Sequence, residues 1–218
     1  MEMNYKYLRR INGYIVLLFL LVFGLIAAYV SLNKIQWFDS PVIHYVQSFE
    51  SPKITSIMEF FTWIGSTKVV ISIIVLICIL LFIFFKHRTE LIFFVIVMLG
   101  STLFNDGLKW LFHRQRPTLH RIIQEVGYSF PSGHSMAAFS LYATLSFLLW
   151  KHIRTQVGRG VMVLFAILMI LAIGTSRIYL GVHYPSDVIG GYFASGVWFI
   201  LCVTVYQWYL EKKFEQGL

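Results

Sequence analysis

Long apolar runs alternate with short polar stretches along the whole chain, and this pattern predicts a bundle of membrane-spanning helices. A helix needs about 20 mostly apolar residues to cross the hydrocarbon core of a bilayer. Three runs are clear candidates, at 13–32, 67–85 and 188–210, and three more carry polar residues at one end, at 91–110, 134–150 and 160–176. We therefore expect an all-α integral membrane protein, a six-transmembrane-helix bundle that forms a single domain over residues 1–218.

The connector between the first two runs, residues 33–66, is too polar to cross the membrane. Ile54, Ile57, Met58 and Phe61 follow the i, i+3, i+4, i+7 spacing of an amphipathic helix. Tryptophans in the same connector are typical of a membrane interface. We expect short interfacial helices here, on the outer leaflet. The pattern leaves open whether they only cap the bundle or also guide a substrate.

Basic residues alternate between the two sides of this predicted bundle. Cytoplasmic loops of membrane proteins are enriched in lysine and arginine. Ten of the eighteen basic residues fall at alternate ends of the runs: Lys6, Arg9, Arg10, Lys86, Arg88, Lys151, Arg154, Arg159, Lys212 and Lys213. Those ends should be cytoplasmic, so a cell-membrane protein with six spans has both termini inside and its other polar stretches outside.

Composition supports a membrane protein and argues against a nucleic-acid-binding one. Hydrophobic residues make up 58% of the chain and charged residues 13%, against about 25% charged in an ordinary soluble domain. The formal charge is +8, but the basic residues are scattered between apolar runs, whereas nucleic-acid binding gathers them on one polar face. The expected partners are the bilayer and a lipid, and no protein partner can be inferred.

The first of three polar stretches at the predicted outer face is KWLFHRQRP, residues 109–117. Lys109 and Arg116 are seven residues apart, nearly two helical turns, so both cations would share one helix face. Pro117 disfavours a helical conformation at Arg116 and marks the expected helix end. A shared bound anion would explain this geometry.

The alternative for this stretch is that basic side chains simply reach from the membrane edge to water. We assign His113 and Arg114 to that alternative. Asp106 lies one turn before Lys109 and would neutralise it.

The second polar stretch is PSGH, residues 131–134, directly before an apolar run. Ser132 can cap a helix, and Gly133 lets a ligand approach the backbone closely. The amides and dipole of a helix start form a ready anion site. His134 would then lie in the first turn, beside the anion, although a Ser-Gly-His sequence alone is also an ordinary cap.

The third polar stretch is SRIYLGVHYPSD, residues 176–187. It adds a cation, Arg177, a second imidazole, His183, and a carboxylate, Asp187, four residues after that histidine. Pro185 suits the opening turn of the last helix, which places His183 just outside it. The carboxylate could accept a hydrogen bond from one ring nitrogen and leave the other as an oriented nucleophile or base. A purely structural His–Asp pair is the alternative.

Taken together, the three stretches indicate chemistry on a phosphate. Three cations and a helix start on one face predict a bound dianion, and two histidines, one backed by a carboxylate, predict a reaction on it. The sequence contains no carboxylate cluster that resembles a metal site. We therefore expect no metal and no cofactor.

These stretches, complete and in order, resemble the K-x6-R-P, P-S-G-H and S-R-x5-H-x3-D motifs of the type 2 phosphatidic acid phosphatase superfamily. The resemblance implies a magnesium-independent lipid phosphatase with a six-helix membrane core. It makes His183 the nucleophile that forms a phosphohistidine, Asp187 the residue that orients it, and His134 the general acid. It assigns the phosphate oxygens to Lys109, Arg116, Ser132, Gly133 and Arg177.

The motifs leave the lipid open. Within this family, small six-span members include bacterial phosphatidylglycerophosphate phosphatases and undecaprenyl pyrophosphate phosphatases. The resemblance favours hydrolysis of phosphatidylglycerophosphate to phosphatidylglycerol, with undecaprenyl pyrophosphate second. Alternatives from other classes are a non-catalytic membrane protein that binds anionic lipids, a haloperoxidase that uses vanadate, and a sugar-phosphate phosphatase. Haloperoxidases of this kind are soluble, so the apolar runs argue against that alternative.

Overall fold

The computed structural model describes residues 5–85, 88–118 and 120–215, and every regular segment in that part of the chain is helical. In chain order the helices are α1 (Tyr5–Ser31), α2 (Gln36–Gln47), α3 (Pro52–Ile64), α4 (Thr67–Leu80), α5 (Arg88–Phe112), α6 (Gly133–Leu149), α7 (Gln156–Tyr179) and α8 (Pro185–Glu215). A π-helical turn, η1 (Leu81–Phe85), extends α4.

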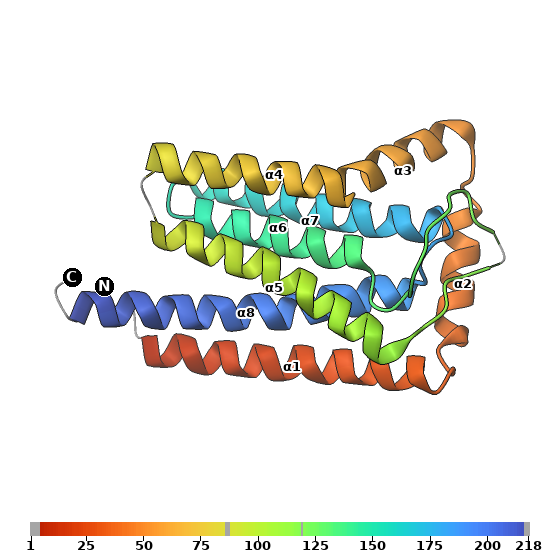
Figure 1. Ribbon diagram of the computed structural model, residues 1–218, viewed down its shortest axis with the longest axis horizontal. Helices are drawn as coiled ribbons and strands as arrows, with labels where there is room; N and C mark the ends of the chain where they lie inside the picture. Colours follow the sequence, from red (N-terminus) through yellow and green to blue (C-terminus); the bar gives the residue numbers. More distant parts are fainter. Residues whose placement is uncertain (1–4, 86–87, 119, 216–218) are drawn as a thin grey trace.

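The long helices run side by side along one axis, and α2 lies across one end of the bundle (Figure 1). Helix α1 begins and α8 ends at the opposite end (Figure 1). Residues 113–132 contain no helix and run across the same end as α2. The polar stretches predicted to meet therefore do lie at one end of the molecule.

Each of the six predicted spans coincides with a helix, but only part of the span count is confirmed. Four helices are long and apolar enough to cross a membrane, namely α1 from Arg9, α5, α7 and α8 to Lys213. Helices α3 and α4 would form a fifth span together, bent by 49°. Helix α6 has only 17 residues, short of the length of about 20 that a span needs. Six spans therefore stay a prediction.

The connector forms two helices, α2 and α3, and the predicted amphipathic stripe lies on α3. Helix α3 begins at a strong local signal, because the Ser51 hydroxyl accepts from the amide of Ile54 and Pro52 occupies the first turn. Ile54 and Met58 pack against a buried cluster that contains Tyr179. Part of the stripe thus faces protein, and an interfacial position for these helices stays a prediction.

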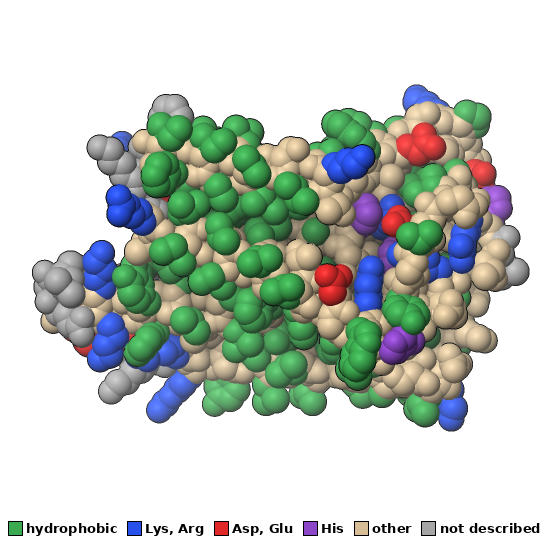
Figure 2. All heavy atoms as spheres, in the orientation of Figure 1, with side chains coloured by type: hydrophobic (Ala, Val, Ile, Leu, Met, Phe, Trp, Pro, Cys, Tyr) green, Lys and Arg blue, Asp and Glu red, His purple; other side chains and the backbone are tan. Residues whose placement is uncertain are grey.

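Charge and apolar surface are separated along the bundle axis. Hydrophobic side chains cover the middle of the face shown in Figure 2, and Lys and Arg lie toward both ends of it, including the end where α1 begins. The basic residues predicted to share one side of the membrane lie at this end: Arg9, Arg10, Arg88, Lys151, Arg154, Arg159, Lys212 and Lys213. Lys86 is outside the described residues, as is the side chain of Lys6. Which side of the membrane this end faces stays a prediction.

Candidate active site

The eight residues predicted to form the site all come to the end of the bundle that carries α2. Lys109 lies in the last turn of α5, Arg116 in the loop of residues 113–132, and Arg177 in the last turn of α7. The PSGH motif supplies the cap and first turn of α6. His183 lies in the short turn between α7 and α8, and Asp187 in the first turn of α8.

The imidazole of His183 is buried and held at both ring nitrogens. Its Nδ1 lies 3.3 Å from Oδ2 of Asp187, and its Nε2 lies 3.0 Å from Nη1 of Arg116. Because a guanidinium can only donate, Nε2 must be the accepting nitrogen, and Nδ1 carries the proton toward the carboxylate. This tautomer leaves the lone pair on the nitrogen that faces the cations.

The charge state of His183 follows from its surroundings. Burial lowers the pKa of His183 most, the carboxylate of Asp187 raises it, and Arg177 and Arg116 lower it further, which leaves the pKa at about 4. An unperturbed histidine has a pKa of about 6.5. The imidazole is therefore neutral near pH 7, as a nucleophile must be.

A cavity of about 270 Å³ opens beside His183 and has two unlike halves. The polar half is lined by Lys109, Arg116, Glu125, His134 and His183. The apolar half is lined by side chains of α4 and α5, among them Val70, Ile71, Ile74 and Met98. Such a cavity can hold a charged headgroup at one side and aliphatic carbon at the other.

Gly133, the first residue of α6, faces the side chains of α5 at the site. A Cβ atom at this position would lie 3.1 Å from Oδ1 of Asn105 and 3.7 Å from Nζ of Lys109. The missing side chain thus leaves the start of α6 open toward the lysine. Asn105 reinforces this contact, because its Nδ2 donates to the carbonyl of Pro131 at 3.1 Å.

Ser132 acts as the helix cap, as predicted. Its hydroxyl accepts from the amide of Ser135 at 3.4 Å, and its own amide donates to the carbonyl of Asp187 at 3.0 Å. Ser132 is fully buried and is not among the residues that line the cavity. In this structure it joins the PSGH motif to the first turn of α8, while a contact with phosphate stays a prediction.

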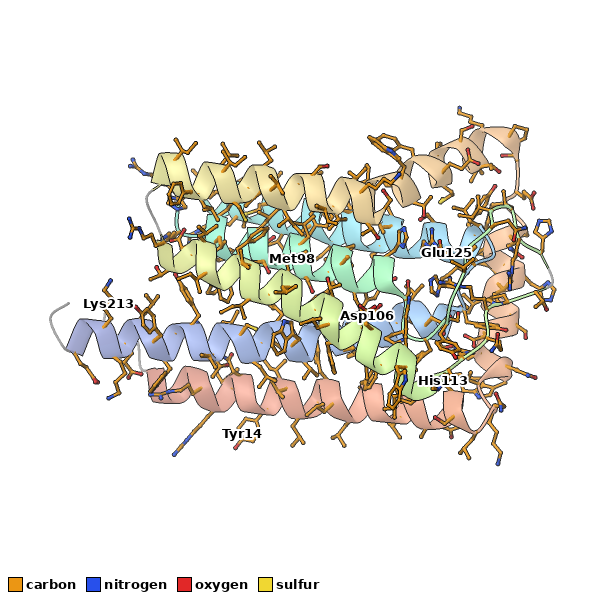
Figure 3. The ribbon with its side chains drawn as sticks, in the orientation of Figure 1. Tyr14, Met98, Asp106, His113, Glu125 and Lys213 are labelled. Atoms are coloured by element: carbon orange, nitrogen blue, oxygen red, sulfur yellow. The ribbon has the colours of Figure 1, made fainter. Side chains whose placement is uncertain are left out.

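Arg177 is the third cation, and Glu125 is its unexpected partner. One terminal nitrogen of Arg177 donates to Oε2 of Glu125 and the other to Thr62 on α3. Its Nε is buried and has no hydrogen-bond partner among the described residues. Glu125, on the loop, and Asp106, on α5, are both labelled in Figure 3 at this end of the bundle. A carboxylate therefore already lies among the cations.

The cations keep Glu125 charged. Burial would raise the pKa of Glu125, but the pairing with Arg177 and the charge of Arg116 lower it, and the net shift is downward. The pKa of Arg116 is also lowered, and burial is the largest cause. A carboxylate thus lies among the cations that are proposed to bind phosphate.

The prediction that the side chain of Arg114 reaches from the membrane edge to water is wrong. Its Nη1 lies 2.6 Å from Oδ1 of Asp187, and its Nη2 lies 2.7 Å from Oδ2 of Asp39. Its side chain is only 13% exposed. The two buried carboxylates draw the guanidinium inward. His113, in contrast, is exposed and rests against the ring of Tyr128.

Five residues at the site were missed by sequence reasoning: Asp39, Asn105, Arg114, Glu125 and Ser129. Ser129 donates its hydroxyl to Oδ2 of Asp187 and so supports the same carboxylate as Arg114. Asn105 had the clearest sequence signal, as a polar residue inside an apolar run one turn before Lys109. The others lie in the connector or in the loop before α6, where no periodic pattern marks them.

The fold and this site together define a membrane protein with a cationic pocket and a histidine–carboxylate pair. The model of the PAP2 superfamily matches residues 90–211, which include all three motifs. The chain belongs to this superfamily.

Similar proteins agree with this assignment. Phosphatidylglycerophosphatase B of Bacillus subtilis is 30% identical over 174 residues, 79% of this chain and 85% of that protein. The crystal structure of a transmembrane PAP2-type phosphatidylglycerolphosphate phosphatase from Bacillus subtilis matches with a TM-score of 0.81 and 27% identity, covering 94% of this chain and 98% of that one. A putative undecaprenyl-diphosphatase, YbjG of Escherichia coli, is 26% identical over 68% of this chain and 74% of that protein.

Proposed function

We propose that this PAP2 superfamily member is a lipid phosphatase that converts phosphatidylglycerophosphate to phosphatidylglycerol through a phosphohistidine on His183. The observation that carries the proposal is the arrangement of the His183 ring. Its Nδ1 faces the carboxylate of Asp187, and its Nε2 faces the cationic cavity. A family match and a relative that bears this activity in its name support it.

In the first step, Nε2 of His183 attacks phosphorus and the ester P–O bond breaks. The lipid alkoxide takes a proton from His134, which lines the same cavity. Asp187 holds the proton on Nδ1 and stabilises the charge that the ring gains when Nε2 is phosphorylated. In the second step, neutral His134 takes a proton from water, the water oxygen attacks phosphorus, and the P–N bond breaks to release phosphate.

Binding must first free the lone pair of His183. In the structure, Arg116 donates to Nε2 at 3.0 Å. A phosphate dianion is a stronger acceptor than a neutral imidazole, so Arg116 would move its hydrogen bond to a phosphate oxygen. Lys109, Gly133, Ser132 and Arg177 complete the proposed set of phosphate ligands. The negative charge of the bound phosphate would also favour a proton on His134.

Charge stabilisation by these cations is the proposed substitute for a metal ion. Phosphoryl transfer depends mainly on positioning and on neutralising charge at the phosphoryl oxygens. Among the described residues, no three His, Cys, Asp or Glu side chains come close enough together to hold a metal ion. We expect turnover to persist in excess chelator, and inhibition that magnesium reverses would contradict this part of the proposal.

The proposal places one domain, residues 1–218, in the cell membrane with six spans, of which α6 and the bent α3–α4 pair are the two that length alone does not establish. The active site would face outward and both termini the cytoplasm. A protease-sensitive tag at either terminus should then be protected in intact cells and cleaved after lysis. Cleavage from outside would invert the orientation.

Undecaprenyl pyrophosphate is the second candidate substrate, favoured by the similarity to a putative undecaprenyl-diphosphatase over 68% of the chain. The deciding experiment measures phosphate release by purified protein, in chelator, from both lipids side by side, with His183→Ala as the blank. Preference for phosphatidylglycerophosphate supports the first candidate, and preference for the pyrophosphate supports the second. Binding of either lipid with no phosphate release would favour a non-catalytic lipid-binding protein.

A further inference from the structure

Two charged residues with no assigned role connect the connector helix α2 to the candidate reacting histidine. Asp39, on α2, is 1% exposed. Arg114, in the loop after α5, lies between Asp39 and Asp187. Because a charge buried without a partner is costly, these three side chains stabilise one another in a single arrangement.

Asp39 is held at the start of α8 by three donors. Its Oδ1 accepts from the amide of Ser186 at 2.9 Å, and its Oδ2 accepts from the hydroxyl of Ser186 at 2.8 Å and from Nη2 of Arg114 at 2.7 Å. A negative charge at a helix N-terminus is favoured by the helix dipole. Asp39 therefore fixes the first turn of α8, in which Asp187 lies, from outside that helix.

Arg114 bridges the two carboxylates with separate nitrogens. Nη1 donates to Oδ1 of Asp187 at 2.6 Å and to the hydroxyl of Ser186 at 2.8 Å, while Nη2 donates to Oδ2 of Asp39. The guanidinium also lies over the ring of Tyr184, 4.0 Å from its centroid. The planar fork of arginine can make this bridge, and a lysine ammonium, with one nitrogen, cannot reproduce it.

The two carboxylate oxygens of Asp187 accept hydrogen bonds from different partners. Oδ2 accepts from Ser129, from the amide of Tyr184 and from His183. For Oδ1, Arg114 is the hydrogen-bond partner that the described residues provide. Without this contact the carboxylate would be held through Oδ2 alone and could tilt about its Cβ–Cγ bond, which would misalign the hydrogen bond that Oδ2 accepts from Nδ1 of His183.

We propose that Asp39 and Arg114 are positioning residues for the phosphatase reaction, which orient Asp187 and, through it, the nucleophile His183. The inference rests on the proposed function, in which His183 attacks phosphorus. It also gives α2 a role in the reaction besides covering the end of the bundle. The alternative is that the Asp39–Arg114 pair only fastens α2 to the bundle.

The test uses full-length protein in detergent and the variants Arg114→Lys and Asp39→Asn, which keep side-chain size nearly constant. We expect kcat to fall about 100-fold in Arg114→Lys, the scale of loss for misplaced reacting groups, and about 10-fold in Asp39→Asn, with KM changed less than threefold in both. The loss should be equal for substrates with good and poor leaving groups, because every substrate needs the nucleophile. The double variant should be no slower than Arg114→Lys alone.

Glu211→Gln is the matched control, because it breaks an ion pair of similar length, 2.8 Å to Arg9, between α1 and α8 at the opposite end of the bundle. It should leave kcat unchanged. Thermal unfolding identifies folded variants, and Asp39→Asn alone suffices if Arg114→Lys does not fold. Normal kcat in folded variants, additive losses, or a loss confined to KM would overturn the positioning role. Normal turnover by His183→Ala would instead contradict the proposed function itself.

Discussion

The two ends of the bundle bury charged side chains in different ways. At the end opposite α2, Glu90 is 3% exposed and pairs with Lys151, whose side chain is 53% exposed. At the other end, Arg114 is shared by the buried carboxylates of Asp39 and Asp187. Glu90 therefore has one partner that reaches water, whereas the carboxylates at the site depend on a network.

The difference explains which changes should affect activity. An ion pair with one partner in water contributes little to the free energy of unfolding, because solvent screens the charges and replaces lost contacts. In a connected buried network, removing one group leaves several others without partners. Substitutions at the site should therefore alter rates, and substitutions at the opposite end should alter only stability.

The largest effect at the site, apart from loss of the nucleophile, is expected for His134→Ala. General acid catalysis contributes about 10²- to 10⁴-fold, so kcat with a lipid phosphate should fall within this range. The loss should shrink with a substrate such as an aryl phosphate, whose leaving group needs no proton. The measurement compares kcat of variant and wild type on both kinds of substrate. An equal loss on both would indicate that His134 positions the phosphate instead.

Glu125→Gln, in contrast to the substitutions that lower activity, should strengthen the binding of anions. The carboxylate of Glu125 pairs with Arg177 and lowers the positive charge available to phosphate. We expect inorganic phosphate to inhibit the variant at about one-tenth of the concentration needed for wild type, a change of about 1.4 kcal/mol. Glu50→Gln is the control, because Glu50 pairs with the exposed His120 and is not among the cavity-lining residues. Weaker inhibition of Glu125→Gln would mean that Glu125 holds Arg177 in place for phosphate.

The pH profile of kcat/KM should be nearly flat on its acid side, down to pH 5. His183 must be neutral at Nε2 to attack, and burial together with Arg177 and Arg116, opposed by Asp187, sets its pKa at about 4. Neutral imidazole therefore persists until the pH approaches that value. For an aryl phosphate, whose leaving group needs no proton from His134, we expect kcat/KM, calculated for a single ionic form of the substrate, to change less than about twofold between pH 7 and pH 5. A decline centred near pH 6.5 would show an unperturbed histidine.

The smallest effect on activity is expected at the opposite end. Lys151→Ala removes the partner of the buried Glu90, which should lower the free energy of unfolding by only about 1 kcal/mol, because solvent replaces part of the lost contact, and leave kcat unchanged. Lys151→Arg should restore the stability. Thermal unfolding and phosphate release on the same preparations test both statements. A loss of kcat in folded Lys151→Ala protein would remove the proposed contrast between the ends.

The helices were largely predictable because apolar runs of this length admit few other structures in a bilayer. The bend of 49° between α3 and α4 was not, since only Gly65 and Ser66 separate the two helices and two residues do not indicate an angle. The motif residues were found because short spacings place them near helix ends. Asp39 was not found, because its partner Arg114 is 75 residues away and nothing local in the sequence indicates a pairing across that separation.

Helix α8 carries Asp187 in its first turn and Lys212 in its last turn, with no break between them. At a rise of about 1.5 Å per residue, the 25 steps between them span about 38 Å, more than the hydrocarbon thickness of about 30 Å. If α8 spans the bilayer as proposed, with the lysine among the headgroups on one side, the carboxylate would stand at headgroup depth on the other. In that orientation, the length of this one helix would set the depth at which a lipid presents its phosphate.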